Sequence, residues 1–432
     1  MTSDTRREIL DDLSSRGLIQ DGTDLELLTK RLSSSPITLY CGFDPTADSL
    51  HVGHLIPLLV LRRFQDAGHK PIALAGGATG MIGDPSGRSE ERNLLTGDEL
   101  NTNVEAIAKQ LRTFLDFESS SLDVGPALLL DNREWTVGLE ALDFLREIGK
   151  HVTVGTMLAK ESVKSRLSSD QGLSFTEFSY MLLQANDFYE LHKCYDCELQ
   201  IGGSDQWGNI TAGIDLIRRR SNATAYGLTV PLITRSDGKK FGKTADGTVW
   251  LDPSRTLPYE LHQYFLNVDD RDVERFLLQL TLLSVSEIFE LIDLHTSAPE
   301  KRIAQRRLAN EVCSLVHGNE ETHRVELAAQ GLFGDEVLTV EILEALRGIV
   351  PETIVDIEVL TGEESLVDAL ENSGLCASRG DARRTIAGGG VSVNGIRQLE
   401  GALALPPDVL IGGRFVLLQK GKRSRHLLVI DQ

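Results

Sequence analysis

The 432-residue chain has few cysteines and no long apolar run. Its five cysteines are an odd and sparse set, which disfavours a disulfide framework and suits a reducing compartment. No apolar stretch approaches the ~20 residues that a membrane-spanning helix needs. The N-terminal sequence MTSDTRREILDDL contains no apolar signal core, which disfavours export. We therefore expect a cytoplasmic protein with no membrane partner.

Two motifs that often carry chemistry are incomplete. The glycine-rich segment GGATGMIGDPSGRSEER lacks the G-x-x-x-x-G-K-[ST] pattern of a phosphate loop, and Arg88 stands where that loop needs lysine. We interpret this segment as a tight turn that offers Asp84 to a ligand site. Cys194 and Cys197 form a CxxC pair, but no further cysteine or histidine pair follows at zinc-site spacing. The sequence therefore predicts no structural metal.

Positive charge is scarce overall, since the formal net charge is −20. Its distribution is uneven, because the segment from Leu375 to Gln432 has nine Arg and Lys residues against four acids, a net +5. A basic segment on an acidic body is typical of a chain in which one part meets a polyanion. The basic residues that we expect to contact a nucleic acid are Arg379, Arg383, Arg384, Lys420, Lys422 and Arg423.

Short apolar strands alternate with longer helical patterns between Ile37 and Ile233. This alternation predicts an α/β fold with a doubly wound, largely parallel, Rossmann-like sheet, whose ligands bind beyond the carboxyl ends of the strands. The first 35 residues are expected to be a helical lead-in. The expected strands are Ile37–Phe43, Pro71–Ala75, Ala127–Leu130, Glu198–Ile201 and Leu228–Ile233.

We expect four segments along the chain. Residues 1–235 form the α/β catalytic domain, and residues 236–318 form a lysine-rich loop and an α-helical domain. Residues 319–360 are acidic and less regular, which suggests a linker region. Residues 361–432 form a small α+β domain, in which Ser378 to Asp381 resembles a helix capping box and Asn394-Gly395 predicts a hairpin.

The stretch from Tyr40 to Leu55 is predicted to contain a buried strand, a polar turn and the start of a helix. His51, Gly53 and His54 fall where that helix begins. A helix N-terminus attracts phosphate, and a glycine there allows close approach to the backbone. Imidazoles can also donate hydrogen bonds to phosphoryl oxygens. Taken alone, the two histidines are more typical of helix caps or surface residues, because such short motifs recur by chance.

Two further segments place polar residues on helices. Tyr180, Gln184 and Asp187 have helical spacing and share one face, which could line a site or could be a solvated surface. In the segment IGGSDQWGNI, Gly203 permits close approach of a ligand. Asp205 is a candidate acceptor for a ribose hydroxyl, although a simple helix cap would look the same.

The segment RSDGKKFGKT is a glycine-containing loop with three lysines, Lys239, Lys240 and Lys243. No apolar periodicity restrains it. Lysines on such a loop can close over a polyphosphate and release it again. The alternative is an ordinary solvated charged loop.

Together these motifs resemble those of the bacterial tyrosyl-tRNA synthetases, over nearly the whole chain. His51-Val52-Gly53-His54 resembles the HIGH signature, and Lys240-Phe241-Gly242-Lys243-Thr244 resembles the KMSKS signature with both lysines retained. GDPSG, SYxLLQxxDF and GGSDQWGN also resemble that family. Residues from about 366 resemble an RNA-binding module shared with a small-subunit ribosomal protein.

The resemblance implies a two-step reaction, in which tyrosine and ATP form tyrosyl-adenylate and the tyrosyl group then passes to tRNA(Tyr). It also implies a homodimer, and Mg²⁺ that enters with ATP. The residues implied for tyrosine are Tyr40 and Asp187 at the phenol, Tyr180, Gln184 and Asp84 at the ammonium group, and Gln206 at the carboxylate. Those implied for ATP are Cys41, Asp44, His51, Gly53, His54, Gly203, Asp205, Lys240 and Lys243. Those implied for catalysis are Thr46, His51, His54, Lys240, Lys243 and Thr244.

Three alternatives remain open at this point. The tryptophan enzyme of the same class is the nearest, although Asp187 beside Tyr40 favours a phenol over an indole. A nucleotidyltransferase could use HxGH without tRNA, but the basic C-terminal segment argues against it. An RNA-binding protein with an inactive catalytic body is the third. Against it, competent residues fill the signature positions.

Overall fold

The computed structural model forms two compact units. The first comprises Met1–Thr256 with Gln263–Val316, and the second comprises Leu257–His262 with His317–Gln432. The structure describes residues 8–84, 95–118, 126–160, 163–164, 167, 173–238, 241–244, 247–334, 337–399, 401–406 and 408–430. No helix within these ranges is both long and apolar enough to cross a membrane.

The first unit is built on a six-stranded sheet with the order β1-β6-β5-β2-β3-β4. All neighbouring pairs are parallel except β1 with β6, so the predicted doubly wound, largely parallel sheet is confirmed. The strands are β1 Asp21–Gly22, β2 Thr38–Phe43, β3 Lys70–Ala75, β4 Leu128–Asp131, β5 Cys197–Gly203 and β6 Tyr226–Val230. The short antiparallel β1 interrupts the helical lead-in expected there.

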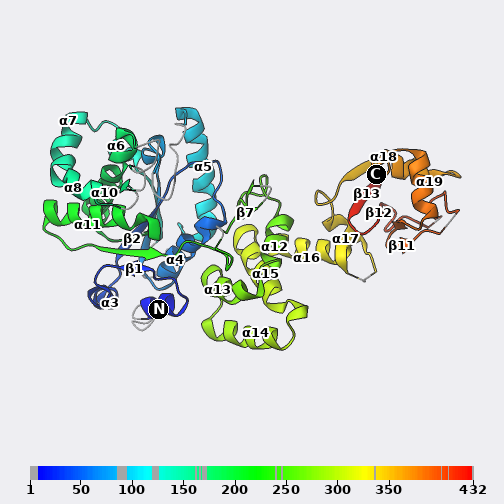
Figure 1. Ribbon diagram of the computed structural model, residues 1–432, viewed down its shortest axis with the longest axis horizontal. Helices are drawn as coiled ribbons and strands as arrows, with labels where there is room; N and C mark the ends of the chain where they lie inside the picture. Colours follow the sequence, from blue (N-terminus) through cyan, green and yellow to red (C-terminus); the bar gives the residue numbers. More distant parts are fainter. Residues whose placement is uncertain are drawn as a thin grey trace. The chain divides into compact units, whose positions relative to one another are not determined.

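Helices cover both faces of this sheet (Figure 1). Helices α4 Leu55–Asp66 and α5 Gly97–Phe114 lie on one side, and α10 Phe175–Tyr195 and α11 Trp207–Ser221 lie on the other. The other α-helices of the described residues up to 317 are α2 Ile9–Ser15, α3 Leu25–Ser34, α6 Arg133–Thr136, α7 Ala141–Asp143, α8 Val154–Leu158, α12 Pro258–Leu266, α13 Asp270–Leu280, α14 Val285–Ser297 and α15 Ile303–His317. A small hairpin, β7 Lys243–Thr244 with β8 Gly247–Thr248, precedes α12.

The strand order reverses next to β2. From β2 the chain continues to β3 and β4 on one side, whereas β5 and β6 extend the sheet on the other side. Loops at such a reversal diverge to opposite faces, so ligands of open α/β sheets bind beyond the carboxyl ends of these strands. The ends of β2 and β5, at Phe43 and Gly203, therefore mark the expected ligand site.

The core between the sheet and α10 includes Tyr40 and Phe188, whose ring centroids are 5.3 Å apart. Both side chains are almost fully buried. Burial of a large side chain contributes about 1.5–3 kcal/mol to folding, so this contact fixes α10 firmly on β2. Since Tyr180, Gln184 and Asp187 lie on the same helix, this packing also sets their position.

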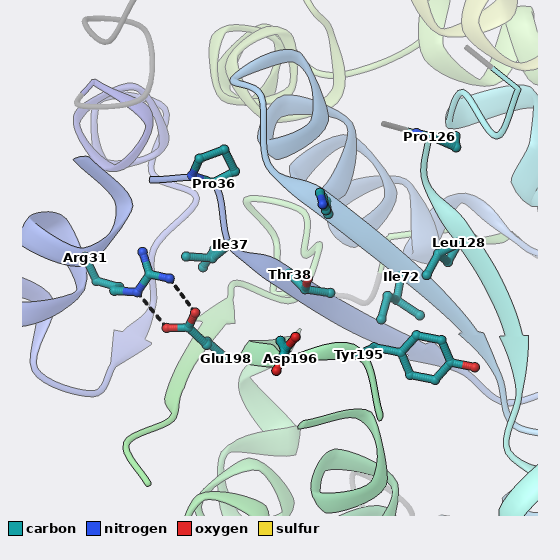
Figure 2. A pocket seen from close by; sticks show the side chains of 11 residues that line it. Arg31, Pro36, Ile37, Thr38, Ile72, Pro126, Leu128, Tyr195, Asp196 and Glu198 are labelled. Carbon is teal, nitrogen blue, oxygen red and sulfur yellow. Dashed lines mark hydrogen bonds and ion pairs between the residues drawn. The ribbon is translucent and has the colours of Figure 1, made fainter. Parts of the chain in front are cut away.

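A pocket of about 640 Å³ opens at the amino ends of the parallel strands (Figure 2). An ion pair between Arg31 and Glu198, 2.5 Å long, forms part of its wall. The other lining residues are Pro36, Ile37, Thr38, Lys70, Ile72, Pro126, Leu128, Tyr195 and Asp196. This pocket lies at the opposite end of the strands from Phe43 and Gly203, and we assign it no part in the predicted site.

The second unit combines helices with a five-stranded mixed sheet of order β11-β10-β12-β13-β9. Its helices are α16 Asn319–Phe333, α17 Val340–Ala345, α18 Ser365–Asn372 and α19 Arg379–Ala387. Its strands are β9 Glu352–Val355, β10 Val391–Val393, β11 Ile396–Arg397, β12 Phe415–Lys420 and β13 Ser424–Ile430. Ser378 caps α19 by accepting a hydrogen bond from the Asp381 N–H, as the sequence predicts. Asn394 and Gly395, both with positive φ, form the predicted hairpin between β10 and β11.

The irregular linker expected over residues 319–360 is corrected by the structure. Helices α16 and α17 lie there, and β9 pairs in parallel with β13. Leu343 and Leu346 pack in one buried cluster with Phe415 and Leu417. These partners lie about 70 residues away in the sequence. The acidic and irregular pattern of residues 319–360 therefore could not indicate that they pack together.

Candidate functional site

Five polar side chains from distant parts of the sequence form one hydrogen-bonded chain beyond β2, β3 and β4. The Tyr180 hydroxyl donates to Asp44 Oδ2 (2.7 Å), and Thr79 Oγ1 donates to Asp44 Oδ1 (2.7 Å). Asn132 Nδ2 donates both to Thr79 Oγ1 and to Asp187 Oδ2, at 3.0 Å each. The predicted residues Asp44, Tyr180 and Asp187 are thus brought together.

The Asp187 carboxylate is buried, and two side-chain donors form hydrogen bonds with it. Trp135 Nε1 donates to its Oδ1 (2.8 Å), while Asn132 donates to its Oδ2. Burial raises the pKa of Asp187 to about 7, although the two hydrogen bonds act in the opposite direction. Asp187 is therefore a buried acceptor whose two donors hold the carboxylate in one orientation.

Two buried polar atoms near Asp187 have no hydrogen-bond partner among the described residues, Tyr40 Oη and Gln184 Oε1. Burial raises the pKa of Tyr40, and the nearby Asp187 charge raises it further, so the two groups lie close enough to interact. Leaving a buried polar group unpaired costs about 1–3 kcal/mol. A ligand hydroxyl beside Tyr40 and Asp187 would remove part of this cost.

The glycine-rich turn after β3 brings a further carboxylate to this edge. A Cβ at Gly76 would lie 2.1 Å from Asp44 Oδ1, so only glycine allows the turn to pack on that carboxylate. The chain then reaches Asp84, whose Oδ2 accepts a hydrogen bond from Gln206 Nε2 (2.5 Å). Asn209 Nδ2 in turn donates to Gln206 Oε1 (3.1 Å). The predicted residues Asp84 and Gln206 are therefore in direct contact.

Lys160 lies beside the same group and is not apparent from the sequence. Its Nζ donates to the Gly208 carbonyl, and burial lowers its pKa to about 7 against the opposing effect of Asp84. Thr79, Asn132 and Trp135 were also missed. Asn132 directly follows the last residue of β4, so its position at a strand's carboxyl end was the available signal.

The two histidines cap the short helix Val52–His54 that leads into α4. His51 Nδ1 accepts from the Gly53 N–H (3.0 Å), and His54 Nδ1 accepts from the His51 N–H (3.1 Å). Their rings stack with centroids 4.0 Å apart. Because Nδ1 is an acceptor in both, Nε2 carries the proton of each neutral ring.

Burial lowers the pKa of His54 well below its ordinary value, and the neighbouring His51 lowers it further. The ring is therefore neutral near pH 7 and is a hydrogen-bond donor through Nε2–H. Such a donor can contact a ligand oxygen without the desolvation cost of a buried cation.

The other residues predicted to contact the nucleotide are Cys41, Thr46, Gly203 and Asp205, which lie on or just after β2 and β5. Cys41 lies on the opposite face of β2 from Tyr40, and burial raises the pKa of its thiol to about 12. Thr46 is exposed in the turn after β2. A Cβ at Gly203 would lie 2.6 Å from Asp205 Oδ1, so the glycine lets β5 end close to the exposed Asp205.

The lysine-containing loop comes next to the histidine turn. Lys240 lies outside the described residues, while Lys243 and Thr244 form β7. The Gly242 carbonyl accepts from the Val249 N–H (2.9 Å), and the Val249 carbonyl accepts from the Val52 N–H (3.1 Å). Backbone hydrogen bonds thus connect the two segments that resemble KMSKS and HIGH.

In the second unit, most of the predicted RNA contacts on α19 are engaged by acids. Glu364 accepts from both Arg379 and Arg383 (2.5 Å each), and Asp368 is 2.7 Å from Arg379. The hydrogen bonds from the two arginines lower the pKa of Glu364, which keeps it ionised.

Lys420 donates a hydrogen bond to Asp381 (3.1 Å) and so links β12 to α19. The three predicted cations that remain are Arg384, Lys422 and Arg423. Arg384 is 76% exposed and only 3.8 Å from the Asp381 carboxylate. Lys422 and Arg423 are exposed in the β12–β13 turn and have no ion-pair partner in the described part of the chain. Arg384, Lys422 and Arg423 are therefore the most available of the six.

Sequence comparison assigns both parts of the chain to known families. The family described as "tRNA synthetases class I (W and Y)" matches residues 32–334. The family described as "Tyrosine--tRNA ligase SYY-like C-terminal domain" matches residues 344–428.

Individual relatives agree with these matches. The chain is 51% identical to a "Tyrosine--tRNA ligase" of Opitutus terrae, over 98% of this chain and 99% of that protein. It is 49% identical to "Tyrosine--tRNA ligase 1" of Bacillus subtilis, over 97% and 99%. A C-terminally truncated mitochondrial tyrosyl-tRNA synthetase of Aspergillus nidulans matches with a TM-score of 0.69 and 32% identity, over 77% of this chain and 98% of that one. The chain belongs to the tyrosine--tRNA ligase family, within the class I tRNA synthetases of tryptophan and tyrosine.

Proposed function

We propose that this chain attaches L-tyrosine to tRNA(Tyr) in two steps. The tyrosine carboxylate first attacks the α-phosphorus of ATP, which forms tyrosyl-adenylate and releases pyrophosphate. The tyrosyl group then passes to the 3′-terminal ribose of tRNA(Tyr), and AMP leaves. Two buried groups carry this proposal. Tyr40 Oη has no hydrogen-bond partner among the described residues, and the Asp187 carboxylate is held in one orientation by Asn132 and Trp135.

The tyrosine phenol binds between Tyr40 and Asp187, where the ligand O–H donates to the carboxylate. Tyr180, Gln184 and Asp84 receive the ammonium group. The available acceptor Gln184 Oε1 and the carboxylate Asp84 give this end the required negative character. Gln206 lies next to Asp84, which supports its role near the substrate carboxylate.

ATP binds where β2 and β5 end, with Cys41, Asp44, Gly53, His54, Gly203 and Asp205 around the nucleotide. Thr46 and His51 stabilise the departing phosphates, while Lys240, Lys243 and Thr244 close over them. No covalent nucleophile is needed, because positioning and charge stabilisation are the main requirements of this step. Mg²⁺ is bound by ATP, since Asp44 and Asp84 already accept hydrogen bonds from protein donors.

Amino-acid-dependent exchange of pyrophosphate into ATP tests the first step. We expect exchange with tyrosine, far weaker exchange with phenylalanine and none above background with tryptophan. Exchange with tryptophan alone would favour the other enzyme of this class. Tight tRNA binding without any exchange would favour an RNA-binding protein that has lost catalysis.

The residues that meet tRNA are Arg384, Lys422 and Arg423. The acids of the second unit hold Arg379, Arg383 and Lys420 at 3.1 Å or less, whereas Arg384 is 76% exposed and 3.8 Å from Asp381. Replacing Arg384, Lys422 and Arg423 by glutamate should lower tRNA charging by at least about 10-fold at 0.15 M salt, since several phosphate contacts are lost. Tyrosine-dependent pyrophosphate exchange should stay within about twofold of the wild type.

The matched control is Arg347→Glu with Arg414→Glu, two cations of the second unit that pair with Glu344. This control should leave charging largely intact. Equal charging by the triple variant and the wild type would contradict the proposed tRNA surface. Substitution is a cleaner test than deletion from residue 361, because β9 would lose its partner β13.

The functional protein is a homodimer, in which the described residues from the end of β4 to the start of α10 meet a second copy. Exposed apolar side chains gather there, namely Val137, Leu142, Leu145, Val154, Leu158 and Phe175. Such a concentration of exposed apolar surface is typical of a subunit interface. The resemblance to the bacterial tyrosyl-tRNA synthetases implies a homodimer, so a second copy is the partner that we propose.

Sedimentation of Leu142→Glu with Leu145→Glu tests this interface. We expect the variant to dissociate at concentrations where the wild type is dimeric, because two buried carboxylates would oppose association. Leu294→Glu, at a residue 64% exposed on α14, is the control that should remain dimeric. A dimer of unchanged stability in the double variant would place the interface elsewhere.

The domain roles follow from these assignments. Residues 1–235 bind tyrosine and ATP, residues 236–318 contribute the lysine loop and its helical support, and the basic part of 361–432 binds tRNA. The protein works in the cytoplasm, consistent with its five cysteines, all free thiols in the structure.

A further inference from the structure

The loop that resembles KMSKS carries Phe241 and Gly242 between its lysines, and both are tightly packed. Phe241 is 8% exposed and inserts among three aromatic rings. Its centroid is 4.4 Å from that of Phe276, 4.8 Å from that of Tyr264 and 5.7 Å from that of Phe265. Helices α12 and α13 therefore provide an aromatic socket for the middle of the loop.

Gly242 is held by a direct hydrogen bond as well as by space. Its N–H donates to the Tyr264 hydroxyl (2.7 Å), and its φ is +85°, which favours glycine. A Cβ at this position would lie 2.5 Å from Val52 Cγ2. Only a residue without a side chain can therefore pass between Tyr264 and the histidine turn.

The backbone continues this connection to the histidines. The Val249 segment bonds to Gly242 on one side and to Val52 on the other, and the Leu251 N–H donates to the Leu50 carbonyl (2.8 Å). His51 lies opposite Trp250 in this antiparallel bridge, with ring centroids 6.1 Å apart. Displacement of Gly242 would therefore disturb the position of His51.

The start of the loop is also anchored to α13. The Ser236 N–H donates to Asp272 Oδ2 (3.0 Å), and Arg275 Nη2 donates to the Thr234 carbonyl (2.5 Å). Asp272 and Arg275 pair with each other at 2.6 Å. The start and the middle of the loop thus rest on the same helical support, α12 and α13.

We propose that Tyr264 is a positioning residue for adenylate formation, which holds Gly242 against Val52 and so sets the backbone of the adjoining Lys243 relative to His51. This inference rests on the proposed roles of Lys243 and His51. The ring of Tyr264 packs on Phe241 and its hydroxyl fixes the adjacent backbone. Loss of the hydroxyl alone should leave the socket filled but release the Gly242 N–H.

The decisive variant is Tyr264→Phe, assayed by single-turnover formation of tyrosyl-adenylate over a range of ATP concentrations. One backbone hydrogen bond corresponds to about a 3- to 10-fold change, so we expect the rate at saturating ATP to fall by that factor. Tyrosine affinity should not change, because the contacts of Tyr264 within the described residues are with Gly242, Phe241 and Phe265, none of which is proposed to bind tyrosine. Tyr226→Phe, which removes a hydroxyl at the amino end of β6, is the matched control.

A double-mutant cycle with Lys243→Ala separates positioning from general structural support. If Tyr264 acts through the loop, Tyr264→Phe should have little further effect once Lys243 is alanine. Additive losses in the double variant, or a wild-type rate in Tyr264→Phe, would overturn the proposal. Failure of the wild-type protein to form adenylate would instead refute the proposed function, so the two failures are distinguishable.

Discussion

Asp187→Asn should lower kcat/KM for tyrosine by about 100- to 1000-fold while the protein remains folded. Both carboxylate oxygens of Asp187 accept hydrogen bonds, from Asn132 and from Trp135. An asparagine amide would direct an NH₂ group at one of these donors. The buried site would then contain a donor–donor conflict, and the substrate phenol would lose its acceptor. Such losses cost about 1–3 kcal/mol each, which together give the expected factor.

The measurement is steady-state pyrophosphate exchange with tyrosine and, separately, with phenylalanine. Phenylalanine lacks the hydroxyl, so its weak activation should change much less and the discrimination between the two amino acids should narrow. Tyrosyl-tRNA synthetases are the known example of this form of selectivity, in which buried groups stay unpaired in the wrong complex.

Asp196→Asn is the control for this experiment. Asp196 follows α10 in a left-handed conformation that asparagine also adopts, at the amino edge of the sheet. It should leave kcat/KM unchanged. A normal kcat/KM in Asp187→Asn would mean that the phenol binds elsewhere.

Lys243→Ala should slow adenylate formation by about 100- to 1000-fold and leave tyrosine binding largely intact. Gly242 packs against Val52, and its carbonyl bonds to the segment that pairs with the histidine turn. The neighbouring Lys243 is therefore close to the proposed position of the phosphates. Removing one preorganised donor to developing phosphate charge has an effect of this size.

Equilibrium binding measures the affinity for tyrosine, and a single-turnover reaction with ATP measures the rate of adenylate formation. Lys70→Ala is the control, because Lys70 lines the pocket at the opposite end of the strands. It should behave as the wild type in both assays. Equal losses of tyrosine affinity and of rate in Lys243→Ala would assign Lys243 to general stability.

Several features of the site were predictable because they depend on local sequence. Apolar strands followed directly by Asp44 and Gly203 placed those residues at the carboxyl edge of a parallel sheet. The helical spacing of Tyr180, Gln184 and Asp187 placed them on one face, although their spacing alone could not distinguish a binding face from a solvated one. The packing of α10 on β2 through Phe188 and Tyr40 decided that question.

Local sequence was enough to predict the α/β sheet, its carboxyl edge and most of the residues that lie there, because strand alternation, helix periodicity and turn chemistry are local properties. Folding of the whole chain was needed to show that Asn132 and Trp135 orient Asp187, that Lys160 is half-buried near Asp84, and that residues 319–360 pack into the second unit. These features depend on contacts between residues far apart in the chain. Burial and pairing of such residues emerge only when the whole chain is folded.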